Sequence, residues 1–442
     1  MLLSRDQALD LARRVLVRSR AEACEVWLDG RAGRNFRIAS RGGATNGASS
    51  GARVVVTAHL GRRRGRALTN DFDDAALADV VTRAEAAARL APENPEAVPP
   101  LGPLAYPQSA AHAETTARLT VPGLADLVAP AVAVARAAPV DTALFAEATE
   151  AWRAYATSAG AAAYDRATAV NLTMTARNRR GTWSGWSGVG ENDAARIDAA
   201  GFARAAIDKA RAELDPVALD PGKYVVLLEP AVVAQFLINL MWRFDARQAD
   251  EGRSFLSKPG GNKLGERLFD ERITVTSNPA DTVAPGYALS DDGQPNLPTT
   301  WIEGGVIKNL ACSRFWAAKT NAPAVPSPGF CAMRGGTDAV DAMIRDVRRG
   351  VLVTRLWYVR TVDRRTVLLT GLTRDGNFLI ENGRVTRPVT NFRFNESPLA
   401  VFSKVLGIGP ARRARPSEVG GTISAPPLLV EDFTFSSISP AI

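Results

Sequence analysis

The stretch KYVVLLEPAVVAQFLINLMWRFDARQADEGRSFL, residues 223–256, decides the fold of the C-terminal half of this sequence. Residues 224–228 are a short apolar run that predicts a buried strand, and Pro230 follows at the first turn of a helix, where proline is tolerated. Apolar residues then recur at three-to-four spacing, which predicts one core-facing side of the helix. They are Val232, Val233, Phe236, Leu237, Leu240, Met241 and Phe244. A strand, a tight turn and a helix followed by a polar loop with Gly252 are typical of an active site.

The N-terminal part reads as a unit of helix, sheet and helix. Ser4 and Gln7 form an S-x-x-Q capping box that predicts a first helix. Strands are predicted at residues 24–29, 35–40 and 53–60. The glycine-rich GGATNGASSG at residues 42–51 predicts a flexible loop. A helix is predicted over residues 71–90, because aspartates stand at its N-terminal end.

The next part extends this unit. The proline-rich residues 91–107 predict a linker or an exposed excursion. Two alternating segments, residues 142–158 and 163–178, predict adjacent antiparallel strands that extend the first sheet. GWSGVG at residues 185–190 is interpreted as a loop at a strand end, and a helix is predicted over residues 193–214.

Beyond residue 256, short apolar runs alternate with turn signals. Strands are predicted at residues 272–277, 301–303, 306–309, 351–361, 365–370, 377–381 and 384–387. IEGGVI and IENGRV predict hairpins, because Gly-Gly and Asn-Gly supply the positive φ angles of a two-residue connection. The fold class is therefore predicted as α+β. We expect an N-terminal α/β domain at residues 1–215, with a mixed or antiparallel sheet and flanking helices, and a mainly antiparallel β domain with a few helices at residues 216–442.

Composition indicates a soluble protein of the cytoplasm. The 442 residues carry a formal net charge of +8, and the arginines are scattered through the chain, so a solvated basic surface is favoured over a nucleic-acid site. Three cysteines are an odd number without close pairing, which fits a reducing compartment. The first residues show no signal-peptide pattern, and no apolar run of about 18 residues predicts a membrane span.

The residue content of the sequence excludes several kinds of catalytic and metal site. The sequence has two histidines, His59 and His112, and none follows, so no catalytic triad or paired-histidine zinc site can form in the C-terminal half. Both histidines are interpreted as ordinary structural or surface residues. Cys312 and Cys331 are interpreted as buried free thiols. The acidic pairs at residues 250–251 and 291–292 lie beside glycine and are interpreted as turn residues.

A family resemblance appears in RRGVLVTRLWYVRTVDRRTVLLTGLTRDGNFLIENGRVTRPVTNFRFNES, residues 348–397. The upstream blocks YVVLLEPAVVAQFL, DEGRSFL, LGERLFDERITV and TTWIEGGVIKNLACSR belong to the same pattern. Together these blocks resemble the TldD/PmbA family of peptidase-related proteins and cover about half the chain. The N-terminal pattern is compatible with the family.

The resemblance implies a metal site that this sequence has lost. Active members of the family carry an HExxxH motif on the helix equivalent to residues 230–244, and a cysteine near the C-terminus completes their zinc site. Here the helix reads QFLINLMWRF, with Asn239 and Trp242 among the residues where the histidines and the glutamate are expected. The segment VLGIGPARRARPSEVGG, residues 405–421, contains no cysteine. We therefore expect no catalytic residue and no bound metal in this chain.

The resemblance also implies a partner and a substrate. The sequence resembles the PmbA-like, or TldE-like, branch, whose members pair with a zinc-bearing TldD-type subunit in a hollow heterodimer that cleaves unfolded peptides. A homodimer stays possible. Arg355, Tyr358 and Arg374 are candidates for facing the chamber and binding peptide, although alternate residues of ordinary strands face outward as well. Arg253 and Ser254 are candidates for the rim of the former metal site.

Two other functions stay open. One is a divergent hydrolase that acts alone or as a homodimer through Asp250, Glu251 or Cys312, although no nucleophile and base are paired in the sequence. The other is a binding or regulatory protein that uses its basic charge on nucleic acid or on an acidic partner.

Overall fold

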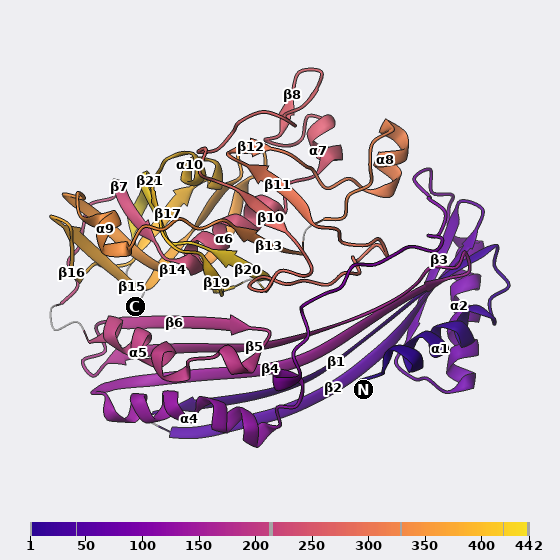
Figure 1. The fold of residues 1–442 in the computed structure, drawn as a ribbon, viewed down its shortest axis with the longest axis horizontal. Helices are drawn as coiled ribbons and strands as arrows, with labels where there is room; N and C mark the ends of the chain where they lie inside the picture. The colour runs from indigo at the N-terminus through magenta and orange to yellow at the C-terminus, as the bar shows by residue number, and fades with distance from the viewer. Residues whose placement is uncertain (1, 41, 212–214, 328, 419, 440–442) are drawn as a thin grey trace.

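The structure is a computed structural model and describes residues 2–40, 42–211, 215–327, 329–418 and 420–439. The first sheet contains β1 (Ala23–Ala39), β2 (Gly42–Leu60), β3 (Arg63–Thr69), β4 (Val140–Thr157), β5 (Ala162–Asn178) and β6 (Ser184–Glu191). Its strand order is β3-β2-β1-β4-β5-β6, and every neighbouring pair is antiparallel. Figure 1 shows this long, curved sheet beneath the C-terminal half. The prediction that two long antiparallel strands extend the first sheet is confirmed.

The glycine-rich residues 42–51 are part of a strand, so the prediction of a flexible loop is wrong. They form the first part of β2, where Gly51 lies opposite Arg31 and Ala44 opposite Ile38 of β1. Because β1 offers backbone partners along this whole length, sheet pairing outweighs the weak strand propensity of Gly, Ser and Asn. Most of these residues are exposed, so no apolar alternation marked them as a strand.

Helices cover the outer face of the first sheet in two groups. They are α1 (Arg5–Leu16), α2 (Asp74–Leu90), the short α3 (Glu114–Ala117), α4 (Val121–Ala137) and α5 (Ala199–Ala210). In Figure 1, α1 and α2 lie at one end of the sheet, and α4 and α5 lie at the other. Each group encloses its own apolar core against the sheet. The predicted capping box of α1 is confirmed, since Gln7 N donates to Ser4 Oγ at 3.3 Å and Ser4 N donates to Gln7 Oε1 at 2.9 Å.

Two predictions before residue 215 are corrected. GWSGVG is not a loop, because it lies within β6. A Cβ atom on Gly185 would lie 2.3 Å from the carbonyl oxygen of Ala206, so the missing side chain lets α5 pack closely on β6. The helix predicted over residues 193–214 is shorter, because a 3-10 turn, η1 (Ala194–Arg196), precedes α5. Residues 212–214 lie outside the described residues.

The proline-rich segment continues without helix or strand as far as residue 113. It crosses between the first sheet and the C-terminal half, to which it is hydrogen-bonded. Tyr106 Oη donates to Gly293 O at 2.6 Å, and Ser109 Oγ donates to Gly286 O at 2.8 Å. The segment is therefore anchored to the C-terminal half where it crosses the sheet.

The C-terminal half contains two further sheets. The second sheet has the order β12-β11-β10-β13-β20-β19. Its strands are β10 (Val275–Ser277), β11 (Thr299–Glu303), β12 (Val306–Ile307), β13 (Phe330–Met333), β19 (Arg412–Ala414) and β20 (Thr422–Ala425). A small hairpin of β8 (Ser257–Lys258) and β9 (Gly261–Asn262) lies apart. The predicted Gly-Gly turn between β11 and β12 is confirmed, with φ values of 54° at Gly304 and 77° at Gly305.

The third sheet closes on itself. Its strands are β7 (Gly222–Leu228), β14 (Arg349–Asp363), β15 (Leu368–Glu381), β16 (Arg384–Pro388), β17 (Phe392–Glu396), β18 (Val405–Ile408) and β21 (Leu428–Ile438). The order is β14-β7-β21-β17-β15-β16, and β14 also pairs with β15, which makes a barrel-like closure. The strand predicted at residues 377–381 and the last three residues of the one predicted at 365–370 belong to the single strand β15, which begins at Leu368. The pairs β7–β14 and β13–β20 are parallel and the others are antiparallel, so the predicted α+β class is confirmed.

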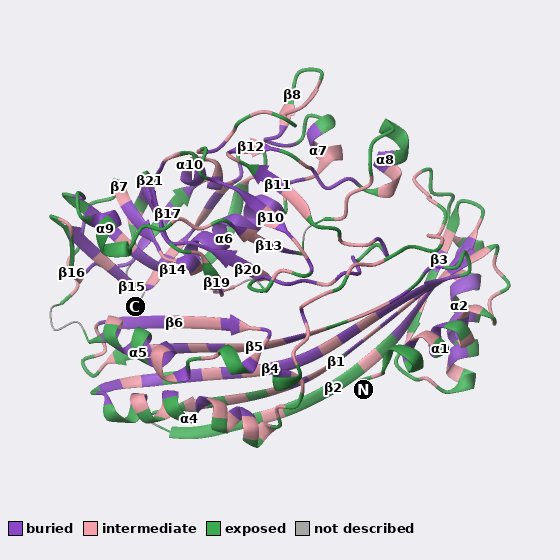
Figure 2. Ribbon diagram, viewed as in Figure 1, coloured by how far each residue is buried: buried purple, intermediate pink, exposed green. Residues whose placement is uncertain are grey.

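The helix of the opening stretch, α6 (Pro230–Met241), lies between these two sheets. It contacts β7 and β14 of the third sheet and β19 and β20 of the second. Every residue except Ala231 is buried, so the helix is core all around and not only on the predicted face, as Figure 2 shows. The remaining helices are the short α7 (Ala246–Asp250), α8 (Arg314–Thr320), α9 (Val340–Ile344) and α10 (Pro398–Ser403).

Within the described residues, no helix has the length and apolar character needed to cross a membrane.

The contact between β3 and α2 yields a test of the fold. A Cβ atom on Gly65 would lie 2.0 Å from Ala88 N and 2.1 Å from Ala84 O, so Gly65→Ala forces α2 away from the sheet. We expect the free energy of unfolding to fall by about 1–3 kcal/mol in urea denaturation. Gly51→Ala is the matched control, because nothing lies within 4 Å of its Cβ position. Equal stability of the two variants would contradict this packing.

Candidate functional site

The two segments in which the resemblance places metal ligands lie together in the structure. A Cβ atom on Gly421, at the end of the segment 405–421, would lie 3.2 Å from Ile238 Cδ1 on α6. Asn239 is 9% exposed, and its Nδ2 donates to the carbonyl oxygen of Gln235 at 2.8 Å, within the same helix. Trp242 is the C-cap of α6 and is 49% exposed. The helix end is thus occupied by an amide bonded to its own backbone and by a solvent-facing indole.

The residues at this helix end do not fit a zinc site. Structural and catalytic zinc ions take at least three imidazole, thiolate or carboxylate ligands from the protein. Across the part of the chain that the structure describes, no three His, Cys, Asp or Glu side chains gather closely enough to hold a metal ion. Asn239 and Trp242 offer no ligand of these types. No step of zinc hydrolysis can therefore be derived from the residues that the structure describes.

Two of the predicted peptide-binding residues meet at the seam between the first and third sheets. Arg355 of β14 lies opposite Arg374 of β15. Arg355 Nη2 is 3.0 Å from Asp375 Oδ2, and Ser184 Oγ of β6 donates to Asp375 Oδ1 at 2.6 Å. Arg374 Nε is 3.8 Å from the same carboxylate. We call Ser184, Arg355 and Asp375 the seam clasp, because they join the two halves of the chain.

Burial changes the pKa of the arginine in the seam clasp. Desolvation lowers the pKa of Arg355, although the nearby Asp375 carboxylate acts in the opposite direction. The guanidinium lies 5.0 Å from the ring of Trp186 and 5.1 Å from that of Trp357, which stabilises it further. Arg355 is therefore held inside the seam by an ion pair and two aromatic rings.

Aromatic and aliphatic side chains are exposed near the end of α6 and along β14. Tyr358, a predicted chamber residue, is 56% exposed and adopts a positive φ of 55°. Arg243 Nη2 donates to Thr361 Oγ1 at 3.3 Å, which joins the end of α6 to β14. We call the exposed side chains here the aromatic patch; they are Trp242, Trp357, Tyr358 and Val362.

The two predicted rim residues follow α7, beside the β14–β15 hairpin. Arg365 Nη2 of that hairpin donates to Gly252 O at 3.1 Å. Arg253 is exposed and its Nε donates to Glu251 Oε2 at 3.0 Å. Ser254 is buried, and its Oγ accepts from Leu256 N at 3.2 Å, so it serves the local turn. Arg253 is thus exposed but paired with Glu251, whereas Ser254 is buried in the turn.

One cavity of the structure was not predicted from the sequence. It has a volume of about 520 Å³ and lies between β4 and β5 of the first sheet, the loop at residues 285–296, and the strands β19 and β20. Arg153 lines it and forms an ion pair with Asp291, at 2.9 Å, while its guanidinium stacks 3.7 Å from the ring of Tyr287. Arg413 and Asn192 line the cavity on the side of β19. No local sequence pattern singled out Arg413 or Asn192 as residues of this cavity.

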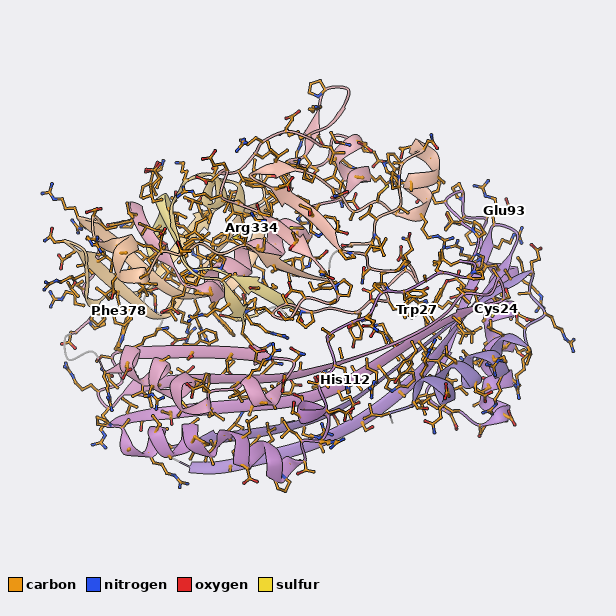
Figure 3. The ribbon with its side chains drawn as sticks, viewed as in Figure 1. Cys24, Trp27, Glu93, His112, Arg334 and Phe378 are labelled. Carbon is orange, nitrogen blue, oxygen red and sulfur yellow. The ribbon has the colours of Figure 1, made fainter. Side chains whose placement is uncertain are left out.

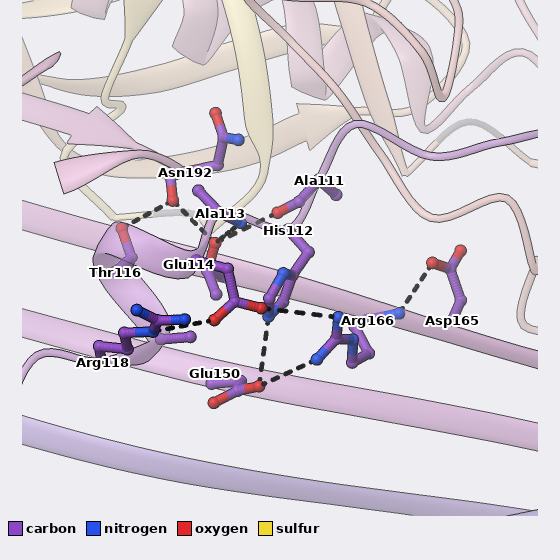
Figure 4. A network of polar contacts seen from close by, with 12 residues as sticks. Ala111, His112, Ala113, Glu114, Thr116, Arg118, Glu150, Asp165, Arg166 and Asn192 are labelled. Atoms are coloured by element: carbon purple, nitrogen blue, oxygen red, sulfur yellow. Dashed lines mark hydrogen bonds and ion pairs between the residues drawn. The ribbon is translucent and has the colours of Figure 1, made fainter. Parts of the chain in front are cut away.

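Polar contacts beside this cavity fix the segment that crosses the first sheet (Figure 4). His112 Nε2 is 3.3 Å from Glu150 Oε1, and its side chain is mostly buried, so His112 is a structural residue and not a surface one. Arg166 lies 3.9 Å from the same carboxylate. Figure 3 places His112 over the middle of the sheet and Cys24 toward the end that carries α1 and α2. His59, at that far end, is buried with its Nε2 2.9 Å from Glu25 Oε1.

The seam clasp yields a stability test. Asp375→Ala leaves Arg355 buried without its carboxylate, so we expect the free energy of unfolding to fall by about 3–5 kcal/mol. Asp79→Ala removes a carboxylate from an exposed pair with Arg83 on α2, and we expect a change of about 0–1 kcal/mol. Urea denaturation measures both, and similar losses in the two variants would argue against a structural clasp.

The chain was compared with known proteins. Residues 221–437 match the model of the PmbA/TldA metallopeptidase C-terminal domain. A curated relative from Methanothermobacter thermautotrophicus, described as a metalloprotease, is 24% identical over 208 residues, which are 42% of this chain and 43% of that relative. This chain therefore spans less than half the length of the curated relative it matches.

Solved structures share the whole fold. TldE from Thermococcus kodakarensis superposes with a TM-score of 0.84 at 16% identity and covers 97% of this chain and 99% of its own. A candidate modulator of a DNA gyrase from Thermotoga maritima superposes with a TM-score of 0.83 at 14% identity, with the same coverage of 97% and 99%. At these identities the likeness shows the fold alone. Together with the family match, it confirms the resemblance seen in the sequence blocks: the chain belongs to the TldD/PmbA family of metallopeptidase-related proteins.

Proposed function

We propose that this chain is a non-catalytic subunit of a cytoplasmic zinc metalloprotease that degrades or trims unfolded peptides. The observation that carries the proposal is the end of α6. It lies against Gly421, as a shared metal site requires, yet it presents Asn239 and Trp242 in place of zinc ligands. The zinc and the activated water then belong to a TldD-like partner with an HExxxH motif. The alternative assembly is a homodimer.

The aromatic patch is suited to meet that partner. Trp, Tyr and Arg side chains carry most of the binding energy in protein interfaces. The patch exposes Trp242, Trp357 and Tyr358, and Arg360 stacks 4.1 Å from the ring of Tyr358. A partner that covers this face closes the chamber around its own zinc site. Arg253, in the loop after α7, and Arg374, on β15, are the predicted contacts to peptide, and Arg355 of β14 lies opposite Arg374.

Co-expression with an HExxxH-bearing homologue from the same genome tests the proposal. We expect a stable complex with about one zinc per pair and peptide cleavage only by the pair, measured by size exclusion, metal analysis and a fluorogenic peptide assay. The double variant Trp242→Ala with Tyr358→Ala should weaken pairing by about tenfold or more, since each truncation removes an exposed interface anchor.

The control variant is Leu90→Ala, which removes a highly exposed apolar side chain at the far end of α2. It should leave pairing unchanged. Stoichiometric zinc with full activity in the isolated chain would overturn the proposal, and so would equal pairing of all variants.

The raised pKa values of the cysteines argue against a stand-alone thiol hydrolase. A catalytic cysteine needs a lowered pKa. Burial, with the nearby Asp250 and Asp245 carboxylates, raises the pKa of Cys312. Burial also raises the pKa of Cys331 to about 12 and that of Cys24 to about 11. Asp250 accepts from Asn262 Nδ2 at 2.6 Å and from Trp316 Nε1 at 2.7 Å, which is a structural role.

Thiol labelling separates the two functions. At pH 8 the folded chain should react slowly with an aromatic disulfide reagent at all three cysteines, because raised pKa values leave little thiolate and burial blocks access. In urea the same reagent should titrate three thiols at the rate of a free cysteine. One fast thiol in the folded protein that disappears in Cys312→Ser would favour the hydrolase.

A further inference from the structure

The cavity between the first sheet and the strands β19 and β20 contains an arginine, Arg413, that has no ion-pair partner among the described residues. We propose that this cavity binds a short peptide whose C-terminal carboxylate is held by Arg413. The proposal rests on the proposed function as a peptide-handling subunit, and it names the end of the chain that this subunit binds.

The hydrogen bonds of Arg413 all go to neutral oxygens. Its Nη1 donates to Asn192 Oδ1 at 3.1 Å and to Val283 O at 3.4 Å, and its Nη2 lies 3.5 Å from Thr422 Oγ1. Among the described residues, no carboxylate lies within ion-pair distance of this guanidinium. Glu191 has the largest favourable effect on its charge, but from beyond that distance. A partly buried cation without a counter-charge is unfavourable, and a bound carboxylate removes that deficit.

The other arginine that lines the cavity, by contrast, is paired with a carboxylate. Arg153, which lines the same cavity, is neutralised by Asp291 at 2.9 Å and also donates to Leu289 O at 3.1 Å. Asp292, another lining residue, accepts from Ser290 Oγ. Within the described residues, the cavity therefore has a cation without an ion-pair partner on the side of β19 and carboxylates near the loop 290–292. A single carboxylate matches this single cation, whereas a doubly charged phosphate is repelled more strongly by the acidic side.

The anchor of Arg413 is fixed before any ligand arrives. Asn192 is buried, and its Nδ2 donates to Ala110 O at 3.1 Å, which orients Oδ1 toward the guanidinium. Its backbone carbonyl accepts from Thr116 Oγ1 at 2.8 Å and from Thr168 Oγ1 at 2.7 Å (Figure 4). Side chains held by such contacts lose little conformational entropy when a ligand binds.

The rest of the cavity suits a short peptide chain. Its volume of about 520 Å³ falls in the range of small-molecule sites. Ala111, Ala167 and Phe330 provide apolar wall, while Gly286 and Gly421 present backbone without side chains. Gly286 in particular cannot carry a Cβ atom, which would lie 2.0 Å from the ring of Phe330. Apolar wall with accessible backbone binds a peptide with little demand on its side chains.

Equilibrium dialysis of the isolated chain against mixed-sequence tripeptides tests this site. One mixture carries free C-terminal carboxylates and the other carries C-terminal amides, and mass spectrometry counts what the protein retains. We expect the free acids to be retained at least tenfold better than the amides, because only the acids pair with the guanidinium. This comparison uses the unaltered protein, so it does not depend on whether a variant folds.

Variants at adjacent positions locate the effect. Arg413→Gln should weaken retention of the free acids by about tenfold, and Arg413→Lys should restore part of it. Arg412→Gln is the matched control, because it removes the same charge from the neighbouring exposed residue of β19. Thermal unfolding of each variant verifies its fold.

Equal retention of acids and amides, no retention of either, or equal loss in the Arg412 and Arg413 variants would each overturn the carboxylate site. Such a failure is distinguishable from failure of the proposed function, because pairing and cleavage with the zinc-bearing homologue are measured separately and do not use this assay.

Discussion

The burial of α6 between the second and third sheets is the constraint on which the C-terminal half depends. Each Val, Leu or Phe that the helix removes from water contributes about 1.5–3 kcal/mol, and its buried residues contact strands of both sheets. Ionisable metal ligands are tolerated in such a place only if a metal compensates their desolvation. A helix without that metal is most stable when it is apolar, which is the state of α6. The same desolvation cost thus accounts for its packing and for the lack of imidazole, thiolate and carboxylate side chains along it.

Two buried arginines show how the halves of the molecule meet. Arg355 is neutralised within the chain by Asp375, and its place between Trp186 and Trp357 makes it part of the scaffold. Arg413 is held by the amide of Asn192 and keeps its charge available. An arginine side chain therefore supports the seam at position 355, whereas the one at position 413 leaves room for a counter-ion. Burial does not distinguish these two roles. The distance from the guanidinium to the nearest carboxylate does.

The sequence predicted the elements that carry their own local signals. The capping box at Ser4, the proline at the start of α6 and the turn at Asn382 and Gly383, with φ values of 48° and 78°, are set by residues close in the chain. The strands at residues 42–51 and 185–190 were missed because their glycines signal turns. In the structure, the glycines at residues 42–51 pair with a distant strand, and Gly185 allows a helix to pack closely on its strand. The cavity at Arg413 joins segments far apart in sequence, so no local pattern indicated it.

The pairing of β7 has a consequence for synthesis on the ribosome. Leu228 of β7 lies opposite Leu428 of β21, and Val225 lies opposite Gly350 of β14. The first sheet, by contrast, consists of strands that all precede β7. It can therefore assemble while the rest of the chain is still being translated. During that interval α6 has left the ribosome without either of its sheets, so its apolar surface stays exposed to water until β20 and β21 are synthesised.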